Sequence, residues 1–241
     1  MCDRSLNHIP KSEERVSRTT NRVSSGGFTS PPPLEAVSQL KRAFEAVANG
    51  NPSVGLKASH GVVLATGNRL GALYGAHIPH FVTAIDKHIG AAFSGLCPDY
   101  RLLVKRANQT ASDYRYAHKE PIRVPQLVNG VGTFMLEYIQ PGGTRPFGAS
   151  MLICGSHQKD YYIPLQAVAQ GVNAKECNIF RADQYKADLR IEESATLAVR
   201  CLKKAFGNAL TGVIVEVGIC MASRFQVQKP TTVAELMAKW A

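Results

Sequence analysis

The residues with the clearest capacity for metal chemistry are three histidines. His77 and His80 have HxxH spacing, and His88 follows shortly after them. A zinc site needs four ligands, commonly at helical or turn spacing, and this stretch supplies neither a fourth ligand nor that spacing. We therefore expect surface or partly buried imidazoles here and no metal.

Other sequence signatures of catalysis are missing. The sequence contains no GxSxG nucleophile motif, no P-loop and no dinucleotide-binding fingerprint, so we expect no cofactor. No two cysteines form a CxxC pair, which favours reduced, mostly buried thiols over a disulfide framework. The six cysteines are Cys2, Cys97, Cys154, Cys177, Cys201 and Cys220.

The formal net charge of +10 raises the question of nucleic-acid binding. The basic pairs Lys41-Arg42, Lys105-Arg106 and Lys203-Lys204 are far apart, and no basic stripe is interleaved with aromatic residues. A solvated basic surface, or one that meets acidic partner subunits, fits this spread better. A nucleic-acid-binding protein stays open as an alternative.

Hydropathy indicates where the chain resides. No apolar run approaches the length of about 18 residues that a membrane helix needs, so no membrane segment is expected. The first 30 residues carry eight charged side chains and no apolar core, so we expect no secretory signal. These features favour cytoplasmic and nuclear residence.

The elements that must position these residues begin after a distinct N-terminal segment. Residues 1–33 are polar and end in three prolines, which is typical of a flexible tail, and residues 34–241 read as one domain. Apolar periodicity predicts helices over 34–49, from 98 onward, over 124–139 and 192–206, and from 231 onward. Predicted strands are 53–58, 62–66, 81–85, 89–94, 149–154, 161–165, 213–220 and 224–228, with 166–188 left unassigned.

This order of elements predicts the fold class. Strands come in antiparallel pairs, including a hairpin of 149–154 with 161–165, and helices come in groups between them. That order favours an α+β fold, a four-layer αββα sandwich of two stacked antiparallel sheets. The continuous apolar run over 62–65 agrees, because each strand of such a sandwich is buried on both faces.

Several stretches resemble proteasome alpha-type subunits, and among these the type 2 subunits most. They are PSVGLKA at 52–58, GVVLAT at 61–66, PDYRLLV at 98–104, GGTRPFG at 142–148 and EVGIC at 216–220. The resemblance covers residues 34–241 and is most specific at Gly143, Arg145, Pro146, Phe147 and Gly148. It implies the N-terminal-nucleophile-hydrolase fold, which is the same sandwich.

The resemblance also implies partners. Such subunits occupy one seat of a seven-membered alpha ring of the 20S core particle, which caps a beta ring and gates substrate entry in ubiquitin-dependent degradation. Neighbouring alpha subunits, the beta ring and regulatory particles on the outer face are thus the expected partners, with no nucleic acid and no membrane.

Catalysis in this fold requires a threonine that self-cleavage after a glycine exposes before the first strand. Gly132-Thr133 lies within a predicted helix, and cleavage at Gly143-Thr144 would leave fewer than 100 residues. Asn51-Pro52-Ser53 stands before the first strand instead. We expect a non-catalytic subunit, with a self-processing threonine peptidase as the alternative.

The sequence departs from the family pattern in its tail and in one pocket. Gln39 begins QLKRA where the family has Gln-x-Glu-Tyr-Ala, Pro33 ends a proline run in place of Phe-Ser-Pro, and Arg22 is retained. These three are the candidate gate and tail residues. Phe81 stands where a lysine normally receives the terminal carboxylate of a regulator, so we expect that pocket to be closed to carboxylates.

Two further features remain ambiguous. The segment between Gly171 and Tyr185 is shorter than its counterpart in relatives. Gly130 and Gly132 lie in a predicted helix, where each glycine lowers helix stability by about 1 kcal/mol relative to alanine. Close approach of a neighbouring helix and tolerated local weakness explain these glycines equally well.

Overall fold

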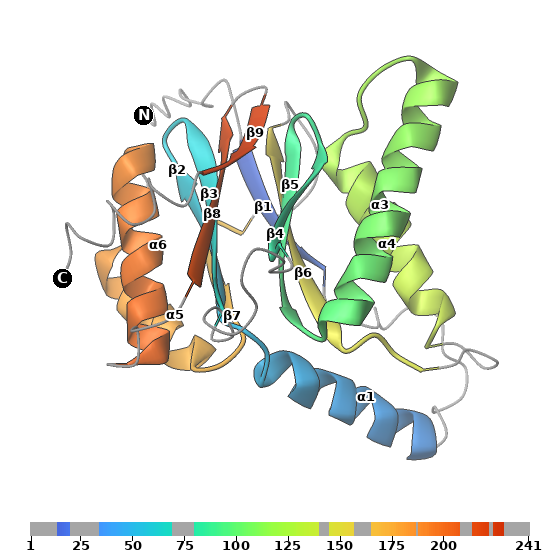
Figure 1. Cartoon of the computed structure of the whole chain (residues 1–241), viewed down its shortest axis with the longest axis horizontal. Helices are drawn as coiled ribbons and strands as arrows, with labels where there is room; N and C mark the ends of the chain where they lie inside the picture. The colour runs from blue at the N-terminus through green and yellow to red at the C-terminus, as the bar shows by residue number, and fades with distance from the viewer. Residues whose placement is uncertain are drawn as a thin grey trace, which may run out of the picture.

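The computed structural model describes residues 14–19, 34–68, 80–139, 145–156, 165–186, 188–207, 214–221 and 224–228. Within these ranges the chain forms two stacked sheets whose paired strands are all antiparallel (Figure 1). The first has the order β1-β6-β5-β4, with β1 at Glu14–Thr19, β6 at Ala149–Ser156, β5 at Ile89–Gly95 and β4 at Val82–Asp86. The second has the order β7-β2-β3-β8-β9, with β7 at Ala167–Gln170, β2 at Ser53–Ala58, β3 at Gly61–Asn68, β8 at Ile214–Met221 and β9 at Arg224–Val227.

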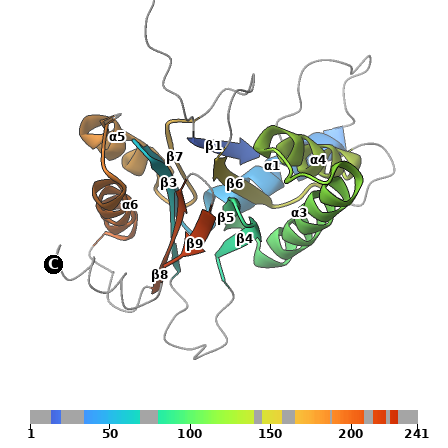
Figure 2. The same ribbon diagram turned by 90° about the horizontal axis from the view of Figure 1, so that it is seen from above.

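Helices cover both outer faces of the stacked sheets. Helices α3 (Cys97–His118) and α4 (Val124–Glu137) lie against the first sheet, and α5 (Ala174–Gln184) and α6 (Ile191–Phe206) lie against the second (Figures 1 and 2). Helix α1 (Leu34–Ala48) lies across one end of the sandwich, where it contacts β5 and β6.

Three apolar layers account for this stacking. One joins α3 and α4 to the first sheet, one joins α5 and α6 to the second, and one lies between the sheets. In β3, Val62 and Leu64 belong to the layer between the sheets, whereas Val63 and Ala65 belong to the layer under α5 and α6. Alternate side chains of a strand point to opposite faces, so a continuous apolar run suits a strand covered on both sides. The predicted four-layer αββα sandwich is confirmed.

Local signals place most elements close to the expected ranges. Helix α3 has its proline, Pro98, in the first turn, where a missing N–H costs nothing because that group would be unpaired. It ends at His118, and the next residue, Lys119, has the left-handed conformation common after a helix, with a φ of 58°. The predicted strands 53–58, 62–66, 81–85 and 89–94 correspond to β2, β3, β4 and β5.

The structure adds one strand in the N-terminal segment to those that the sequence predicts. Residues 14–19, expected within a flexible tail, form β1, which extends the first sheet beside β6. The expected hairpin of 149–154 with 161–165 stays a prediction, because most of its second strand is not described. The described neighbours of β6 are β5 and β1. The next described strand is β7, and it pairs with β2 in the other sheet. Residues 161–164 and the expected helix from 231 lie outside the described residues.

The segment 166–188, which the sequence pattern left unassigned, contributes β7 and α5. The boundary between tail and domain at residues 33 and 34 stays a prediction.

Candidate functional site: the α1 end of the sandwich

The start of β2 is closed to solvent. An N-terminal nucleophile of this fold would be needed at this position. Ser53 begins β2 with no exposed surface, and its hydroxyl donates a hydrogen bond to the Phe93 carbonyl oxygen. Thr66 donates its hydroxyl to Ser53 Oγ at 3.1 Å. The chain runs on through Pro52, whose carbonyl accepts from the Gly67 N–H at 3.1 Å. The Ser53 hydroxyl is therefore buried and hydrogen-bonded to both Phe93 and Thr66.

Helix α1 is held firmly over this end of the sandwich. Ser94 Oγ donates to the Val47 carbonyl at 3.0 Å, which fixes the last turn of α1 to β5. Just beyond the helix, a Cβ on Gly50 would lie 2.1 Å from the backbone nitrogen of Gly95. Only glycine allows the chain to approach the sheet this closely.

The motif residues lie at the same end and connect α3, the loop before β6 and α1. Arg145 forms two hydrogen bonds to the Asp99 carboxylate, at 2.7 and 2.6 Å, and Asp99 also accepts the Gly148 N–H at 2.8 Å. Burial raises the pKa of Asp99, but the hydrogen bonds from Arg145 and Gly148 outweigh it and hold the pKa below its usual range. Phe147 is buried against Tyr138 and Phe134, with ring centroids 4.6 and 5.7 Å away.

These contacts give the motif a structural role in orienting the start of α3. Arg145 also donates to the carbonyl of Pro146 at 3.2 Å, which stiffens the turn. Gly143 lies outside the described residues.

Phe81 lies in the apolar core rather than on an accessible wall. Its side chain is 4% exposed and stacks on Phe93 with ring centroids 5.4 Å apart, and Phe93 in turn stacks on Tyr100 at 3.9 Å. The Phe81 and Val82 N–H groups donate to the Glu216 carboxylate at 2.8 and 3.0 Å. The side chain at position 81 therefore faces inward and offers no charge.

Of the three candidate gate and tail residues, the structure describes Gln39. Gln39 is half-buried on α1, and Arg22 and Pro33 lie outside the described part of the chain. Lys41 and Arg42, which replace the acidic and tyrosyl positions of the family pattern, are exposed on α1.

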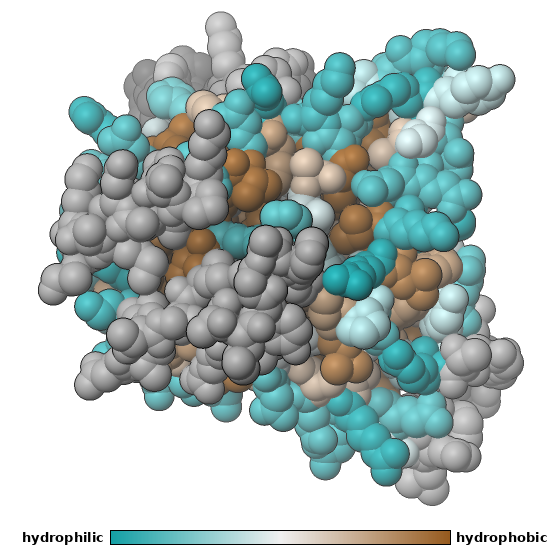
Figure 3. All heavy atoms as spheres, viewed as in Figure 1, coloured by the Kyte–Doolittle hydropathy of each residue, from teal (hydrophilic) through white to brown (hydrophobic). Residues whose placement is uncertain are grey.

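Helix α1 also presents apolar side chains to solvent. Leu40 and Val47 are half-buried and Ala43 is buried, but Val37 is 49% and Phe44 is 46% exposed. Leu96, just before α3, is 46% exposed. In Figure 3 hydrophilic residues predominate over α3, and hydrophobic ones gather near the centre of that face.

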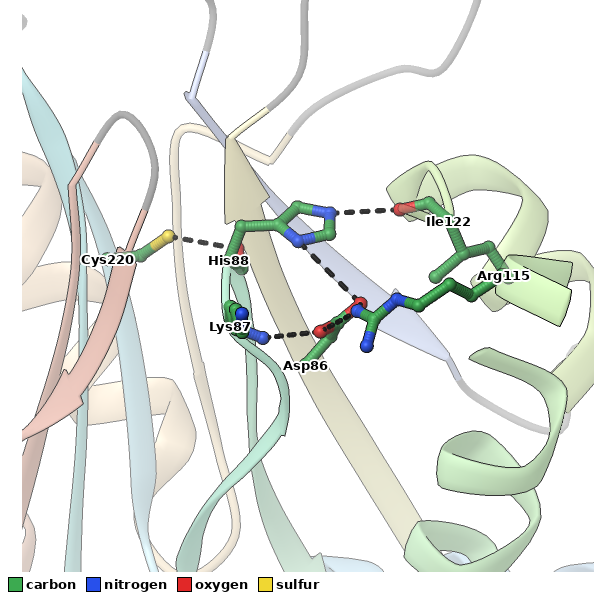
Figure 4. Close-up of polar contacts among 6 residues, drawn as sticks. All are labelled: Asp86, Lys87, His88, Arg115, Ile122 and Cys220. Atoms are coloured by element: carbon green, nitrogen blue, oxygen red, sulfur yellow. Dashed lines mark hydrogen bonds and ion pairs between the residues drawn. The ribbon is translucent and has the colours of Figure 1, made fainter. Parts of the chain in front are cut away.

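The two described histidines of this stretch, His80 and His88, face different carboxylates. His80 is exposed, with Nδ1 3.5 Å from Glu216, and His77 lies outside the described residues. His88 Nε2 lies 2.9 Å from the Ile122 carbonyl, while its Nδ1 faces Asp86 at 3.8 Å (Figure 4). No group of three metal-ligating side chains occurs among the described residues.

Two carboxylates were not singled out by the sequence pattern. Asp86 pairs with Arg115 through both carboxylate oxygens, and burial, which raises its pKa, is outweighed by Arg115 so that the pKa falls below its usual value (Figure 4). Glu216 secures the start of β4. Only the presence of an acidic residue in an otherwise apolar strand, EVGIC, could have pointed to Glu216.

Two cysteines, Cys177 in α5 and Cys201 in α6, are buried. Burial raises the pKa of the Cys177 thiol to about 11 and that of Cys201 to about 12, so both stay protonated near neutral pH.

None of the helices in the described ranges has the length and apolar character to cross a membrane.

Comparison with known proteins places the chain in a family. The proteasome subunit family matches residues 47–220. Proteasome subunit alpha type-2 of Drosophila melanogaster is 42% identical over 217 residues, covering 86% of this chain and 93% of the relative. The alpha type-2 subunit of Caenorhabditis elegans is 36% identical, covering 80% and 88%, and alpha type-2-A of Arabidopsis thaliana is 32% identical, covering 86% and 93%. The chain therefore belongs to the proteasome subunit family, as an alpha-type subunit most like those of type 2.

Proposed function

We propose that the chain is a non-catalytic structural and gating subunit of the alpha ring of the 20S proteasome core, which serves ubiquitin-dependent protein degradation. The observation that carries the non-catalytic part is the state of Ser53. A threonine peptidase of this fold needs a hydroxyl open to substrate and a free α-amino group beside it. At Ser53 the hydroxyl has no exposed surface and donates a hydrogen bond to the Phe93 carbonyl oxygen.

The assembly part draws support from the surface of α1. Val37 and Phe44 are each about half exposed on a helix packed at the end of the sandwich. Apolar side chains grouped on one helix face are typical of surfaces that other subunits cover. We propose neighbouring alpha subunits and the beta ring as partners, with regulatory particles on the outer face, in the cytoplasm and nucleus.

The gating part concerns the segment before α1. We propose that this segment, with Arg22, Pro33 and Gln39, contributes to the gate with contacts that differ from the usual ones, because Lys41 and Arg42 replace an acidic residue and a tyrosine. We also propose that the regulator pocket at Phe81 does not hold a carboxylate, which the inward position of its side chain supports. A regulator peptide whose carboxylate another group holds in this pocket would contradict that proposal.

The test is purification of the tagged chain from its own cells, followed by native mass measurement and identification of the co-purifying chains. We expect a particle many times larger than one chain, containing other alpha-type and beta-type subunits, with this chain uncleaved before Ser53. A monomer, or a complex without those subunits, would overturn the assembly proposal. Loss of the segment before Ser53 would instead favour a self-processing threonine peptidase. Salt-dependent binding of DNA or RNA by the purified chain would favour a nucleic-acid-binding protein.

A further inference from the structure

Side chains of α5 are hydrogen-bonded to the main chain of β7, the outermost strand of the second sheet among the described residues (Figure 2). The Ala169 N–H donates to Asn178 Oδ1 at 3.2 Å, and the Asn178 side-chain amide donates to the Ala169 carbonyl at 3.4 Å. Arg181 donates from Nη1 to the Ala167 carbonyl. Main-chain groups two residues apart on a strand point to the same side, and the other side of β7 pairs with β2. Asn178 and Arg181 therefore lie where a neighbouring strand would lie.

The same cover continues onto β2, past the end of β7. Tyr185, just after α5, donates its hydroxyl to the Lys57 carbonyl at 3.1 Å. Two residues further along this edge, the Ser59 N–H donates to the Leu189 carbonyl at 2.9 Å. The segment from α5 to the start of α6 thus covers the edge of both strands.

The packing of α5 differs from that of α6. Asn178, Arg181 and Tyr185 follow one another at three and four residues, the spacing that places side chains on one face of a helix. A helix normally turns an apolar face to its sheet, yet in α5 only Cys177 is buried, whereas α6 is buried along most of its length. Polar contacts with the sheet edge therefore contribute much of what holds α5 in place.

Strand β7 lacks the features that protect an exposed edge. Its sequence, AVAQ, contains no charged residue and no proline, and an unprotected edge is a template for pairing with another chain. The outward main-chain groups belong to Ala167 and Ala169, on either side of Val168. In an antiparallel pair of two β7 strands related by a twofold axis through Val168, each Ala167 would lie opposite Ala169 of the other copy. The edge covered by α5 is therefore complementary to itself.

We propose that the outer edge of β7 is a strand-pairing site for β7 of a second copy of this chain, and that α5 keeps this site closed. The Asn178 amide carries the same donor and acceptor groups as a peptide bond, and Arg181 supplies a donor to the next carbonyl. Without these two side chains α5 retains only Cys177 as a buried anchor and moves off the edge, which then pairs through main-chain hydrogen bonds. This inference concerns the second sheet and does not require that the chain enter an alpha ring.

A cysteine at position 168, on the twofold axis of the pair, tests the proposal. Val168→Cys is combined with Asn178→Ala and Arg181→Ala, so that the Cα atoms of the two cysteines lie about 4.5 Å apart, within reach of a disulfide. Diamide takes up the two hydrogens that the thiols lose as the disulfide forms. Peptide mass spectrometry of the full-length chain should detect a 168–168 link, which joins two copies. Val168→Cys with Asn178 and Arg181 intact is the matched control, and the triple variant should give at least about tenfold more of this link.

Sedimentation under reducing conditions provides the second measurement, because a cysteine pair can be docked and still poorly oriented for oxidation. Asn178→Ala/Arg181→Ala should dimerise at least about tenfold more tightly than the wild-type chain. Lys175→Ala/Asp183→Ala, at exposed positions of α5, is the control and should sediment as the wild type does. Circular dichroism establishes that each variant is folded. If the double variant unfolds, Asn178→Leu, which keeps the bulk of the side chain without its hydrogen-bonding groups, takes its place with the same expected shift.

A folded variant that lacks the cover and shows neither the link nor tighter dimerisation would overturn the proposal. Equal amounts of the 168–168 link with and without Asn178 and Arg181 would show that α5 does not close the edge. Tighter dimerisation without the link would place the contact elsewhere and would overturn the proposed pairing. All of these measurements are made on the purified chain, so their failure is distinct from failure of the proposed function.

Discussion

Asp99 combines three roles at the first turn of α3. It is an acidic group at the positive end of the helix dipole, the partner of Arg145, and the acceptor of the Gly148 N–H. Its carboxylate is 5% exposed, so the fold depends on these partners to keep a buried charge stable. The predicted helix start at residue 98 was therefore close to the observed one, but it did not reveal these contacts of Asp99.

Replacement of Asp99 tests this arrangement. Asp99→Asn keeps the shape but removes the charge, and should lower the free energy of unfolding by about 1–3 kcal/mol at pH 7, toward the lower value because Arg145 is 56% exposed. In the folded state the pKa of Asp99 lies below 3.8, the ordinary value of an aspartate carboxyl group. The stabilisation should thus be complete above that value and disappear as the pH falls through the lower folded-state pKa.

Urea unfolding of the purified chain across this pH range is the measurement, with Asp113→Asn on the exposed side of α3 as control. Equal urea midpoints for the two variants at pH 7 would contradict the role given to Asp99.

At the scale of elements, the two glycines of α4 have different explanations. A Cβ on Gly130 would lie 3.0 Å from Thr110 Cγ2 of α3, which is tighter than an ordinary contact. A Cβ on Gly132 would meet nothing within 4 Å. Close approach of α3 therefore accounts for Gly130, whereas no described atom of this chain restricts Gly132. Thr110 cannot shift freely, because its hydroxyl donates to the Arg106 carbonyl at 2.9 Å.

Alanine substitutions should separate the two cases. Gly132→Ala should raise the free energy of unfolding by about 0.5–1 kcal/mol, because alanine loses less backbone entropy in a helix. Gly130→Ala should gain less or destabilise, because Thr110 must move. In a Thr110→Ser background, which lacks the obstructing methyl group, Gly130→Ala should approach the gain of Gly132→Ala in urea unfolding. An equal gain from both single variants would show that the contact with Thr110 is unimportant.

At the scale of the whole molecule, the sandwich buries its strands thoroughly but leaves α1 partly uncovered. The three apolar layers enclose both faces of both sheets among the described residues. Helix α1 contacts β5 and β6 of the first sheet, and its large side chains Val37 and Phe44 remain about half exposed. Within the proposed ring, this surface is the part of the chain best suited to a neighbouring subunit.

Replacement of Phe44 should therefore affect assembly more than folding. Phe44→Ser should weaken incorporation into the particle by about 2 kcal/mol, or roughly 30-fold in affinity, because buried aromatic residues often dominate interfaces. Competition between tagged variant and untagged wild-type chains in cells, followed by quantification in the purified particle, measures this. Glu45→Ser, an exposed polar change on the same helix, is the control and should incorporate normally. Equal incorporation of both variants would place the subunit contact elsewhere.

The sequence by itself determined the layers, most element ranges and the family. The run over 62–65 showed a strand covered on both faces, and Pro98 marked the start of α3, because local patterns register which face is buried and where a helix can begin. The tertiary structure decided which distant segments meet: β1 beside β6, β7 beside β2, Asp99 with Arg145, and Phe81 in the core. Main-chain pairing at a sheet edge is almost independent of side-chain type, and these contacts join residues far apart in the chain. Local periodicity therefore has no means of specifying them.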